Sequence, residues 1–467
     1  MLRRRSFVAS LVASALGAGC RASGPSVLPG PTRRVVVIGA GVAGLTVAQL
    51  LRAAEIEVVV VEARERVGGR LHTVEVAGAP VDLGAAWIHG RSGNPVAAMA
   101  DGYGVATRPH PYEPIALRDA VEGRFAGEAE LAAALEREDP FLAALASLQA
   151  QLGAGASVQA AIDAHVAGLG LSAREERYAR LALEQYVIEV DYGGPADRTS
   201  LAIFDEDEFY GYDDHVLVGG YRSLLTPLQE GLDVRLATPV TCVAYDAGEV
   251  RVETAGGEVF TADRAIVTVP LGVLQAGSIT FAPALPAAKV AAIGRLEMGS
   301  LEKVILRWPS AFWPEGADAA WLHAGATRGE FPLIVDLSGS AGAPTLVLVH
   351  GGSRAREALD TMSDEALVAS AIAVLESVLG GPVPAPLDAV VTRWRGDPYC
   401  RGSYSFPALG QSLDDFDSLA APVGDRVLFA GEATSRASFG TVHGAVLSAL
   451  REAQRLGVDG GGVPGLG

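Results

Sequence analysis

The pattern of hydrophobic and polar positions predicts a strand, a turn, a helix and a second strand near the start of the chain. Residues 35–38 are all apolar, and the run is short enough for a buried strand. After a glycine-rich turn, apolar residues continue through Leu51 in a predicted helix. A second apolar run, Val58–Val61, predicts the next strand. This order is typical of an α/β domain.

The middle of the chain predicts further helices and strands. Residues 128–189 are rich in Ala, Leu and Glu and predict several amphipathic helices. The breaks between them are expected near Pro140, Gly153 and Gly168–Gly170. Residues 297–391 predict a mixture of strands, such as Thr345–His350, with a helix over Asp364–Leu379.

The composition is that of a large globular protein. The 467 residues are 49% hydrophobic and 20% charged, which supplies a sizeable core and excludes global disorder. No apolar run reaches the roughly 18 residues that a membrane-spanning helix requires, so a polytopic membrane protein is excluded. The net charge of −18 argues against nucleic acid as a partner and suits a cationic ligand.

Residues 1–30 are interpreted as an export signal followed by a tether. Three arginines, Arg3–Arg5, precede the short apolar stretch Phe7–Ala13, which is the pattern of a signal peptide. The segment Arg4–Phe7 resembles the twin-arginine signal, so export to the periplasm or cell envelope is expected. The segment Leu16–Cys20 is similar to a lipoprotein box with its leucine one place too far upstream, which leaves lipid attachment at Cys20 open.

The turn after the first strand has the residues needed to bind a dinucleotide. Gly39, Gly41 and Gly44 have the spacing that permits a tight turn, close approach of the backbone to a pyrophosphate, and close packing of helix on strand. The helix that follows attracts phosphate to its N-terminus. Glu62, at the end of the second strand, stands where a ribose-binding carboxylate is expected.

A second glycine-rich run follows directly and supplies more amides and a cation for a pyrophosphate. It contributes Arg64, Gly68, Gly69 and Arg70. Together with the segment Asp82–Gly90, this run resembles the flavin-dependent amine oxidases, a family that includes monoamine, polyamine and spermine oxidases and the lysine-specific histone demethylase. With Gly93–Pro95 shortly after, the resemblance is greatest to the polyamine and spermine oxidase branch.

The resemblance recurs along nearly the whole chain and implies the fold of that family, classed as α/β (α+β). A Rossmann-like FAD-binding domain is expected from discontinuous segments, beside a mixed sheet-and-helix substrate-binding domain. The FAD-binding segments are expected at 31–90, 216–290 and 390–456, and the substrate-binding segments at 91–215 and 291–389. Residues 457–467 are glycine-rich and are predicted to form a flexible tail.

The resemblance also implies which later residues hold FAD. Val240 would lie against its adenine end, Glu432 would bind its ribityl or pyrophosphate region, and Trp394 would complete the site. The amides near Thr441 and Val442, at a helix start, would stabilise negative charge on the reduced ring.

Non-covalent FAD is expected from one departure. In monoamine oxidases a cysteine immediately before the active-site tyrosine is bonded to the flavin, and this chain has Ser403 there. The distant cysteines Cys242 and Cys400 also lack the clustered spacing of a metal site, so no metal is expected.

Three residues are expected to act on the substrate. Lys303 lies in an alternating apolar run that predicts a strand, and by resemblance it holds a water against the flavin nitrogen that accepts the hydride. Tyr404 forms one wall of the family's aromatic cage, whose other wall aligns with Thr441. His89 matches a position that faces the amine in polyamine oxidases. A solvated Lys303, a packing role for Tyr404 and a structural His89 are the alternatives.

An acidic run lies near the expected substrate-binding domain. It comprises Asp205–Glu208 and, shortly after, Asp213 and Asp214. A solvated edge is one interpretation, and an electrostatic funnel for a polycation is the other.

The predicted function is oxidation of amines, with polyamines favoured. Hydride passes from the carbon next to nitrogen to the flavin, the imine is hydrolysed to an aldehyde, and molecular oxygen accepts the electrons to give hydrogen peroxide. An L-amino-acid oxidase stays open because Arg91 lies near the position, Trp87, where such enzymes carry a carboxylate-binding arginine. An aryl-alkyl monoamine oxidase, or a flavin dehydrogenase or flavin-binding protein that does not use oxygen, also stays open, as does the oligomeric state.

Overall fold

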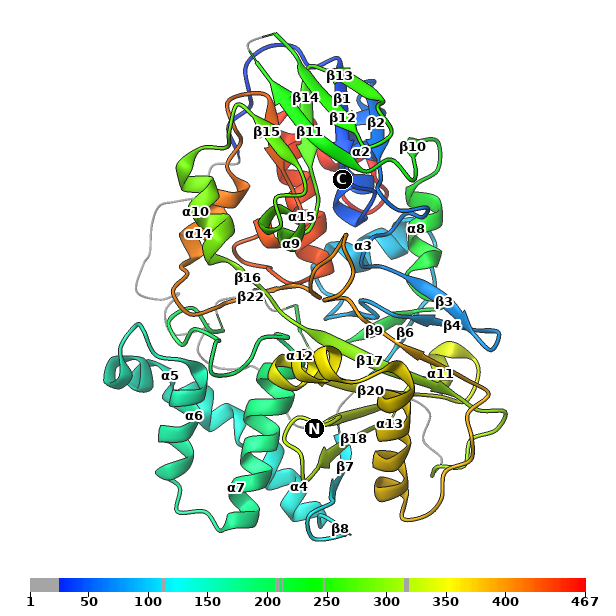
Figure 1. The fold of residues 1–467 in the computed structure, drawn as a ribbon, viewed down its shortest axis with the longest axis vertical. Helices are drawn as coiled ribbons and strands as arrows, with labels where there is room; N and C mark the ends of the chain where they lie inside the picture. The colour runs from blue at the N-terminus through cyan, green and yellow to red at the C-terminus, as the bar shows by residue number, and fades with distance from the viewer. Residues whose placement is uncertain are drawn as a thin grey trace.

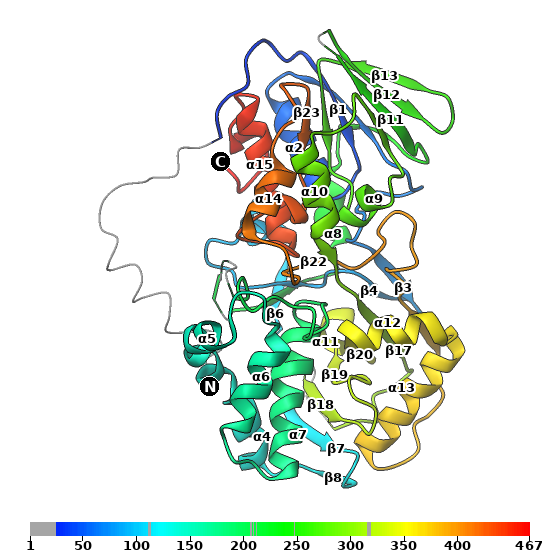
Figure 2. The same ribbon diagram turned by 60° about the vertical axis from the view of Figure 1, so that its left-hand side comes forward.

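The structure is a computed structural model that describes residues 25–467, apart from 111–113, 206, 207, 209, 212, 247 and 315–318. The predicted export signal and lipid attachment at Cys20 fall on residues outside that range. The described chain forms two halves, stacked one above the other in Figure 1. Each half is built from several stretches of sequence, so the chain crosses between the halves repeatedly (Figures 1 and 2).

The upper half in Figure 1 is built around a parallel sheet of five strands in the order β10-β2-β1-β14-β23. Its central strands are apolar because helices or strands cover both faces of the sheet. Helices α2 (Val42–Ala53) and α15 (Val442–Arg455) pack together on one face. The strands are β1 (Arg34–Ile38), β2 (Glu57–Val61), β10 (Asp233–Arg235), β14 (Arg264–Val267) and β23 (Val427–Phe429).

Smaller elements complete the upper half. The opposite face of the parallel sheet is covered by a four-stranded sheet of β13 (Val259–Ala262), β12 (Val250–Thr254), β11 (Val240–Tyr245) and β15 (Thr280–Ala282). The helices around it are α3 (Pro95–Gly102), α8 (Arg222–Leu228), α9 (Leu271–Gln275), α10 (Ala287–Arg295) and α14 (Leu413–Ala420). Three short sheets lie toward the junction: β3 (Thr73–Val76) with β4 (Ala79–Asp82), β16 (Glu297–Met298) with β22 (Ser405–Phe406), and β5 (Trp87–Ile88), β9 (His215–Leu217) and β6 (Thr107–Pro109).

The lower half contains a seven-stranded sheet with helices on both faces. Along β17, alternate residues face opposite layers: Val304 and Leu306 pack with α13, whereas Ile305 packs with the helices of residues 128–190. In sheet order the strands are β21 (Asp388–Val391), β17 (Leu301–Arg307), β20 (Thr345–Gly351), β19 (Leu333–Asp336), β18 (Ala320–Ala324), β7 (Pro114–Asp119) and β8 (Arg124–Phe125). The helices are α4 (Glu128–Leu135), α5 (Glu138–Leu152), α6 (Val158–Ala167), α7 (Ala173–Arg180), the π-helical η1 (Leu181–Val190), α11 (Ser338–Ala341), α12 (Gly352–Thr361) and α13 (Asp364–Leu379).

Most predicted elements are confirmed, with two differences. Strands β1, β2, β17 and β20 and helices α2 and α13 lie where the hydrophobic pattern placed them. Pro140 does not break the helical region, because it occupies the first turn of α5, where its missing N–H has no helical acceptor. The break instead falls between α4 and α5, at residues 136 and 137.

The expected flexible tail at residues 457–467 is the second difference, and that prediction is wrong. Val463 is buried in the same core cluster as α2 and α15. A Cβ atom on Gly462 would lie 2.6 Å from that of Ala53, and one on Gly465 would lie 2.0 Å from the carbonyl oxygen of Ala98. The glycines of this segment therefore serve close packing against α2 and α3.

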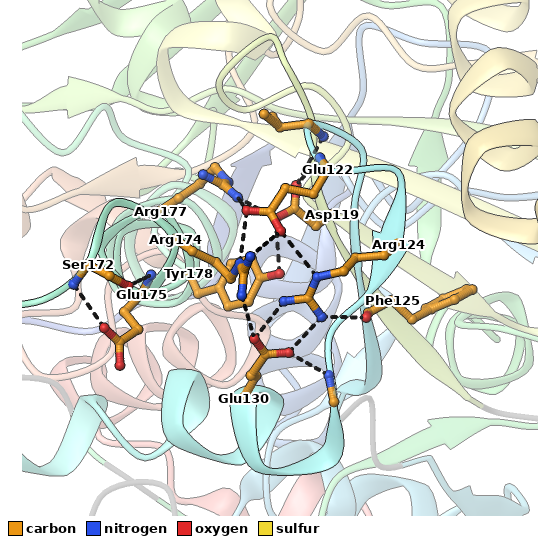
Figure 3. Close-up of polar contacts among 12 residues, drawn as sticks. Asp119, Glu122, Arg124, Phe125, Glu130, Ser172, Arg174, Glu175, Arg177 and Tyr178 are labelled. Carbon is orange, nitrogen blue, oxygen red and sulfur yellow. Dashed lines mark hydrogen bonds and ion pairs between the residues drawn. The ribbon is translucent and has the colours of Figure 1, made fainter.

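A network of ion pairs fastens the β7–β8 hairpin to the helices of the lower half (Figure 3). At its centre Asp119 is fully buried and accepts hydrogen bonds from Arg177 and from the Tyr178 hydroxyl. Arg124 binds Glu130 of α4 through both carboxylate oxygens, at 2.8 and 2.6 Å.

None of the helices in the described part of the chain is long and apolar enough to cross a membrane.

Candidate active site

A cavity of about 370 Å³ lies where the two halves meet. Its lining includes residues from the turn before α2, from β17 and from the start of α15. Of the residues predicted to hold the cofactor or the substrate, those on the lining are Gly41, Gly68, Arg70, His89, Lys303, Trp394, Tyr404, Glu432, Thr441 and Val442. The fold therefore gathers most of these residues, which are far apart in sequence, around one space.

The first glycine-rich turn has the geometry of a dinucleotide site. Gly39 has φ +106°, and a Cβ atom on Gly44 would lie 2.0 Å from the carbonyl oxygen of Gly39, so both positions require glycine. A Cβ atom on Gly41 would meet no atom within 4 Å, so this glycine borders open space in the cavity. No side chain caps the N-terminus of α2. The open space and the uncapped amides fit a pyrophosphate group.

The second glycine pair packs directly on the first turn. The Gly68 amide donates to the carbonyl oxygen of Ala40 at 2.8 Å. Gly68 has φ +97°, and a Cβ atom there would lie 2.3 Å from the carbonyl oxygen of Leu71. Gly69 has φ +58° and approaches the Cα atom of Gly41. Of this pair, Gly68 is on the lining of the cavity and Gly69 is not.

Glu62 is buried and holds the turn together from behind the cavity. Its two carboxylate oxygens accept hydrogen bonds from the amides of Ala40, at 2.7 Å, and Arg64, at 2.9 Å. Glu62 is not on the lining of the cavity, so its predicted contact with a ribose hydroxyl stays a prediction. Val240 is buried at the start of β11. Two residues before it, the Thr238 amide donates to the carbonyl oxygen of Glu62.

Arg64 lies outside the cavity lining and binds protein groups. Its guanidinium forms a two-pronged ion pair with Asp397, at 2.9 and 2.6 Å, and donates to the Cys400 sulfur at 3.2 Å. These contacts hold the pKa of the Asp397 carboxyl below its usual range despite burial, which acts in the opposite direction. Arg64 thus ties the second glycine run to the segment 397–400.

Arg70 and Glu432 form an ion pair on the lining of the cavity. The Arg70 Nη1 atom donates to Glu432 Oε1 at 2.8 Å and to the carbonyl oxygen of Ser403 at 3.0 Å. The second oxygen of Glu432 accepts from the Ser405 hydroxyl at 2.5 Å and from the Gly440 amide at 2.8 Å. The Glu432 carboxylate therefore joins three segments, and Arg70 presents a cation beside them.

Lys303 points inward from β17, as predicted, and its side chain is buried. The ammonium donates to the carbonyl oxygens of Gly84, at 2.6 Å, and Asp82, at 3.2 Å. Burial lowers the pKa of Lys303 to about 8, although the nearby Asp82 and Glu302 carboxylates oppose that change. Burial likewise raises the pKa of Asp82 to about 6, against hydrogen bonds from the Thr73 hydroxyl and the Tyr221 amide.

Two tryptophans stand beside this lysine on the cavity lining. The Trp394 indole donates to the carbonyl oxygen of Leu83 at 3.3 Å, between the two carbonyls that bind Lys303. The Trp87 indole donates to Nδ1 of the fully buried His110 at 3.2 Å. The ring of Trp87 has its centroid 5.5 Å from the Lys303 ammonium nitrogen, which is within range of a cation–π interaction.

Tyr404 is held on its ring and at its hydroxyl. The hydroxyl donates to the carbonyl oxygens of Val190, at 3.0 Å, and Asp191, at 3.2 Å, at the end of η1. A Cβ atom on Gly193 would lie 3.0 Å from the ring, and one on Gly440 would lie 3.2 Å from it. Burial raises the pKa of Tyr404 well above its usual value, so the hydroxyl stays protonated.

Thr441 is the N-cap of α15. Its hydroxyl accepts from the Gly444 amide at 2.9 Å and donates to the carbonyl oxygen of Ser438 at 2.7 Å. The hydroxyl is thus committed to the helix start, and the first turn of α15, beginning at Val442, borders the cavity. Phe439, which sequence reasoning did not single out, also lines the cavity close to Thr441.

Besides Glu432, four acidic residues line the cavity. Two belong to the predicted acidic run: Glu208, which accepts from the Tyr210 hydroxyl at 2.9 Å, and Asp214, which accepts from the Gly90 amide at 2.8 Å. Asp214 also approaches the half-exposed His89 imidazole at 3.6 Å. Glu138 and Asp191 join them from the helical region and were not foreseen, because single acids among surface helices give no signal in the sequence.

Arg91 is engaged elsewhere. Its guanidinium binds both carboxylate oxygens of Asp101 at 2.7 Å and donates to the Thr107 hydroxyl at 2.6 Å. It is not on the lining of the cavity. The cation that could have bound the carboxylate of an amino acid therefore already has an acidic partner.

Known proteins share this arrangement of chain. Residues 42–457 match the profile of the family described as flavin containing amine oxidoreductase. This chain belongs to that family. It is 33% identical over 435 residues to Polyamine oxidase 2 of Arabidopsis thaliana, a match that covers 90% of this chain and 87% of the relative. A structure of putrescine oxidase bound to putrescine has the same fold, with a TM-score of 0.75 at 22% identity over 91% of this chain and 99% of that chain.

A second group of relatives is longer than this oxidase. Lysine-specific histone demethylase 1 homolog 1 of Arabidopsis thaliana is 35% identical over 441 residues, which cover 90% of this chain and 52% of the relative. The chain thus spans about half the length of that relative.

The predicted resemblance, the mixed α/β fold and the amine oxidase activity are confirmed by these matches. The cofactor is a flavin, and the dinucleotide-type turn identifies it as FAD. Neither of the cysteines in the described part of the chain, Cys242 and Cys400, lies on the cavity lining, which accords with non-covalent binding. Ser403 stands at the position of the covalent cysteine. Its hydroxyl accepts a hydrogen bond from the Leu301 amide and donates one to the Leu301 carbonyl oxygen.

Proposed function

We propose that this oxidase acts on polyamines, with molecular oxygen as the electron acceptor. For a secondary amine the overall reaction consumes the amine, oxygen and water, and gives an aldehyde, a shorter amine and hydrogen peroxide. The observation that supports a polyamine is a group of four acidic residues on the cavity lining besides Glu432, which is paired with Arg70: Glu138, Asp191, Glu208 and Asp214. Distributed negative charge suits a chain that has several ammonium groups.

The cavity can treat the reacting nitrogen and the remaining nitrogens of a polyamine differently. FAD, when bound, supplies the acceptor for the hydride. The reacting amine must first lose its proton, because a protonated nitrogen has no lone pair to stabilise the developing cation. Apolar walls such as Trp87 and Tyr404 lower the pKa of an amine held against them, while the carboxylates retain its distal ammonium groups. The Tyr404 hydroxyl is held by the end of η1, which keeps the ring in place as a wall.

Lys303 is suited to holding a water molecule beside the flavin. Two of the three N–H bonds of its ammonium are directed to the carbonyl oxygens of Asp82 and Gly84, which leaves one for a water. Because the pKa of Lys303 is lowered to about 8, the side chain can release a proton near neutral pH more readily than an exposed lysine. This supports a role in hydrolysis of the imine or in the reaction with oxygen.

The test is peroxide release in air by the FAD-loaded enzyme. The panel holds spermine, spermidine, N-acetylated polyamines, putrescine, benzylamine, phenethylamine and several L-amino acids. Peroxide from polyamines supports the proposal. Turnover of arylalkylamines alone would show that the substrates are monoamines and not polyamines. Turnover of amino acids would contradict the proposal. Reduction of the flavin by a polyamine without reoxidation in air would assign the acceptor elsewhere.

The role of the carboxylates is tested by the variant Glu208→Gln. Glu208 lines the cavity and is exposed, so its replacement should leave the fold intact. We expect KM for spermine to rise about tenfold, with KM for benzylamine unchanged within twofold. Glu249→Gln, at an exposed turn outside the cavity, changes the net charge equally and is the matched control. Equal effects of Glu208→Gln on both substrates would reject the electrostatic role.

We also propose export across the inner membrane by the twin-arginine route. The supporting observation is the Arg4–Phe7 segment, together with a cofactor that is held by a folded protein. Replacing Arg4 and Arg5 by lysine should retain the enzyme in the cytoplasm, as measured by fractionation. Labelling with a radioactive fatty acid distinguishes lipid attachment at Cys20 from simple cleavage of the signal.

A further inference from the structure

Glu302, the residue before Lys303 on β17, is a buried carboxylate with no assigned role. It is 1% exposed and lies on the face of the sheet that packs against α13, because consecutive strand residues point to opposite faces. Its strand neighbours on that face, Val304 and Leu306, are buried and apolar. A carboxylate in such a layer is costly unless it has hydrogen-bond partners.

Those partners all belong to the turn that follows β21. Glu302 accepts from the Thr392 hydroxyl at 2.6 Å and from the Arg395 amide at 3.3 Å. The pairing of β21 with β17 ends at Val391. Beyond it, the Glu302 carboxylate accepts the hydrogen bonds of the turn that backbone carbonyl oxygens of β17 would otherwise accept. Thr392 in turn accepts from the Lys303 amide at 2.8 Å, and its own amide donates to the Lys303 carbonyl oxygen at 3.0 Å.

The turn leads directly to the cavity through Trp394. Its indole donates to the carbonyl oxygen of Leu83, while the Lys303 ammonium binds the carbonyl oxygens on either side, those of Asp82 and Gly84. Three successive carbonyls thus fix the far ends of the two side chains. Thr392 binds both backbone groups of Lys303, and Glu302 binds Thr392 and the turn that contains Trp394.

We infer that Glu302 is a positioning residue, whose buried carboxylate sets Lys303 and Trp394 together at the flavin site. The inference rests on the proposed function only in that both concern the same site. It places a determinant of that site on the opposite face of the sheet, where no contact with substrate or cofactor is needed.

The carboxylate also acts on Lys303 by its charge. Its negative charge raises the pKa of the lysine against the effect of burial, as does Asp82 on β4. Arg393 and Arg395 are the cations nearest to Glu302 on the turn, and they interact with Asp364 and Asp360. Burial raises the pKa of Glu302 itself to about 7, and its hydrogen-bond donors oppose that change. Glutamine at this position removes the charge and retains the shape.

The test compares Glu302→Gln and Glu302→Ala in the FAD-loaded enzyme, with readouts that need no amine. These are the dissociation constant for FAD, the visible flavin spectrum, and the rate at which dithionite-reduced enzyme is reoxidised by air at pH 6 to 10. Glu452→Gln, which removes a fully buried carboxylate on α15 away from this turn, is the matched control.

For Glu302→Ala we expect FAD binding weakened about tenfold and a changed flavin spectrum, because Trp394 loses its support. For Glu302→Gln we expect near-normal FAD binding. If the reoxidation rate follows the titration of Lys303, whose pKa is about 8, its inflection should move about half a pH unit or more toward lower pH, because the charge that raises this pKa is gone. An unchanged pH profile in the glutamine variant, with an unchanged spectrum and FAD affinity in the alanine variant, would overturn the inference. If Glu302→Ala fails to fold, the pH profile of Glu302→Gln still decides the question. Absence of polyamine turnover would reject the proposed substrate without altering these readouts.

Discussion

The position of the Tyr404 ring can be perturbed at Gly193, which touches the ring from outside the cavity lining. Gly193 has φ +65°, and a Cβ atom there would lie 3.0 Å from Cζ and 3.1 Å from Cε2 of Tyr404. Alanine in the left-handed region costs about 1 kcal/mol of stability. It would also displace the ring by a few tenths of an ångström and disturb the hydroxyl contacts with η1. We expect Gly193→Ala to lower kcat/KM for amine about tenfold, equivalent to about 1.4 kcal/mol in the transition state.

Gly170→Ala separates the two effects. Gly170 has φ +61°, and a Cβ atom there would meet no atom within 4 Å, so alanine has the same backbone cost without any contact. In urea unfolding Gly170→Ala should lose about 1 kcal/mol and Gly193→Ala at least as much, and only Gly193→Ala should lose activity. The assay is steady-state peroxide release with FAD saturating, alongside FAD titration. If the two variants keep equal kcat/KM, the placement of the Tyr404 ring does not limit the reaction and the reasoning is refuted.

Three further predictions concern groups away from the cavity. Asp119→Asn should destabilise the protein by about 3 kcal/mol in urea unfolding, since it leaves Arg177 without its buried partner (Figure 3), whereas Glu249→Gln should cost under about 1 kcal/mol. Burial lowers the pKa of Lys289 from 10.5 to about 7, so the unfolded chain binds more protons between these values. The free energy of unfolding of the wild type minus that of Lys289→Met should therefore rise as the pH increases from about 7 to 10. A difference that does not change with pH would contradict this prediction. Arg91→Gln should leave polyamine kcat/KM within twofold; a tenfold loss would place Arg91 in the substrate site.

Local patterns in the sequence predict the parts of the fold that depend on local chemistry. The apolar run of β1 and the glycine spacing after it correctly predict a strand, a tight turn and a helix, because each depends on neighbouring residues. The place of Lys303 in an apolar strand left a solvated side chain open, and only the family resemblance implied that it points inward. Glu302 lies beside it among apolar residues of the same run, and sequence reasoning did not single it out.

Pairings between distant segments could not be predicted. Arg64 meets Asp397, which lies 333 residues further along the chain, and nothing in either segment indicates the other. Arg91 is engaged by Asp101 only because β5 and α3 bring them together. The glycines after residue 457 suggested flexibility, although here they permit close packing, since small residues serve both purposes.

The order of strands in the parallel sheet has a consequence for how the protein is made. Strand β14 pairs with β1 on one side and with β23 on the other, and β23 begins only at Val427. About 390 residues separate the first strand from the last, which a ribosome takes about 20 to 80 seconds to synthesise. The nascent chain cannot complete its FAD site during that interval, so cofactor loading must follow synthesis of β23 and of the lining residues beyond it, such as Glu432. A transport route that accepts finished proteins suits such a chain, whereas threading an unfolded chain through a channel would separate it from its cofactor.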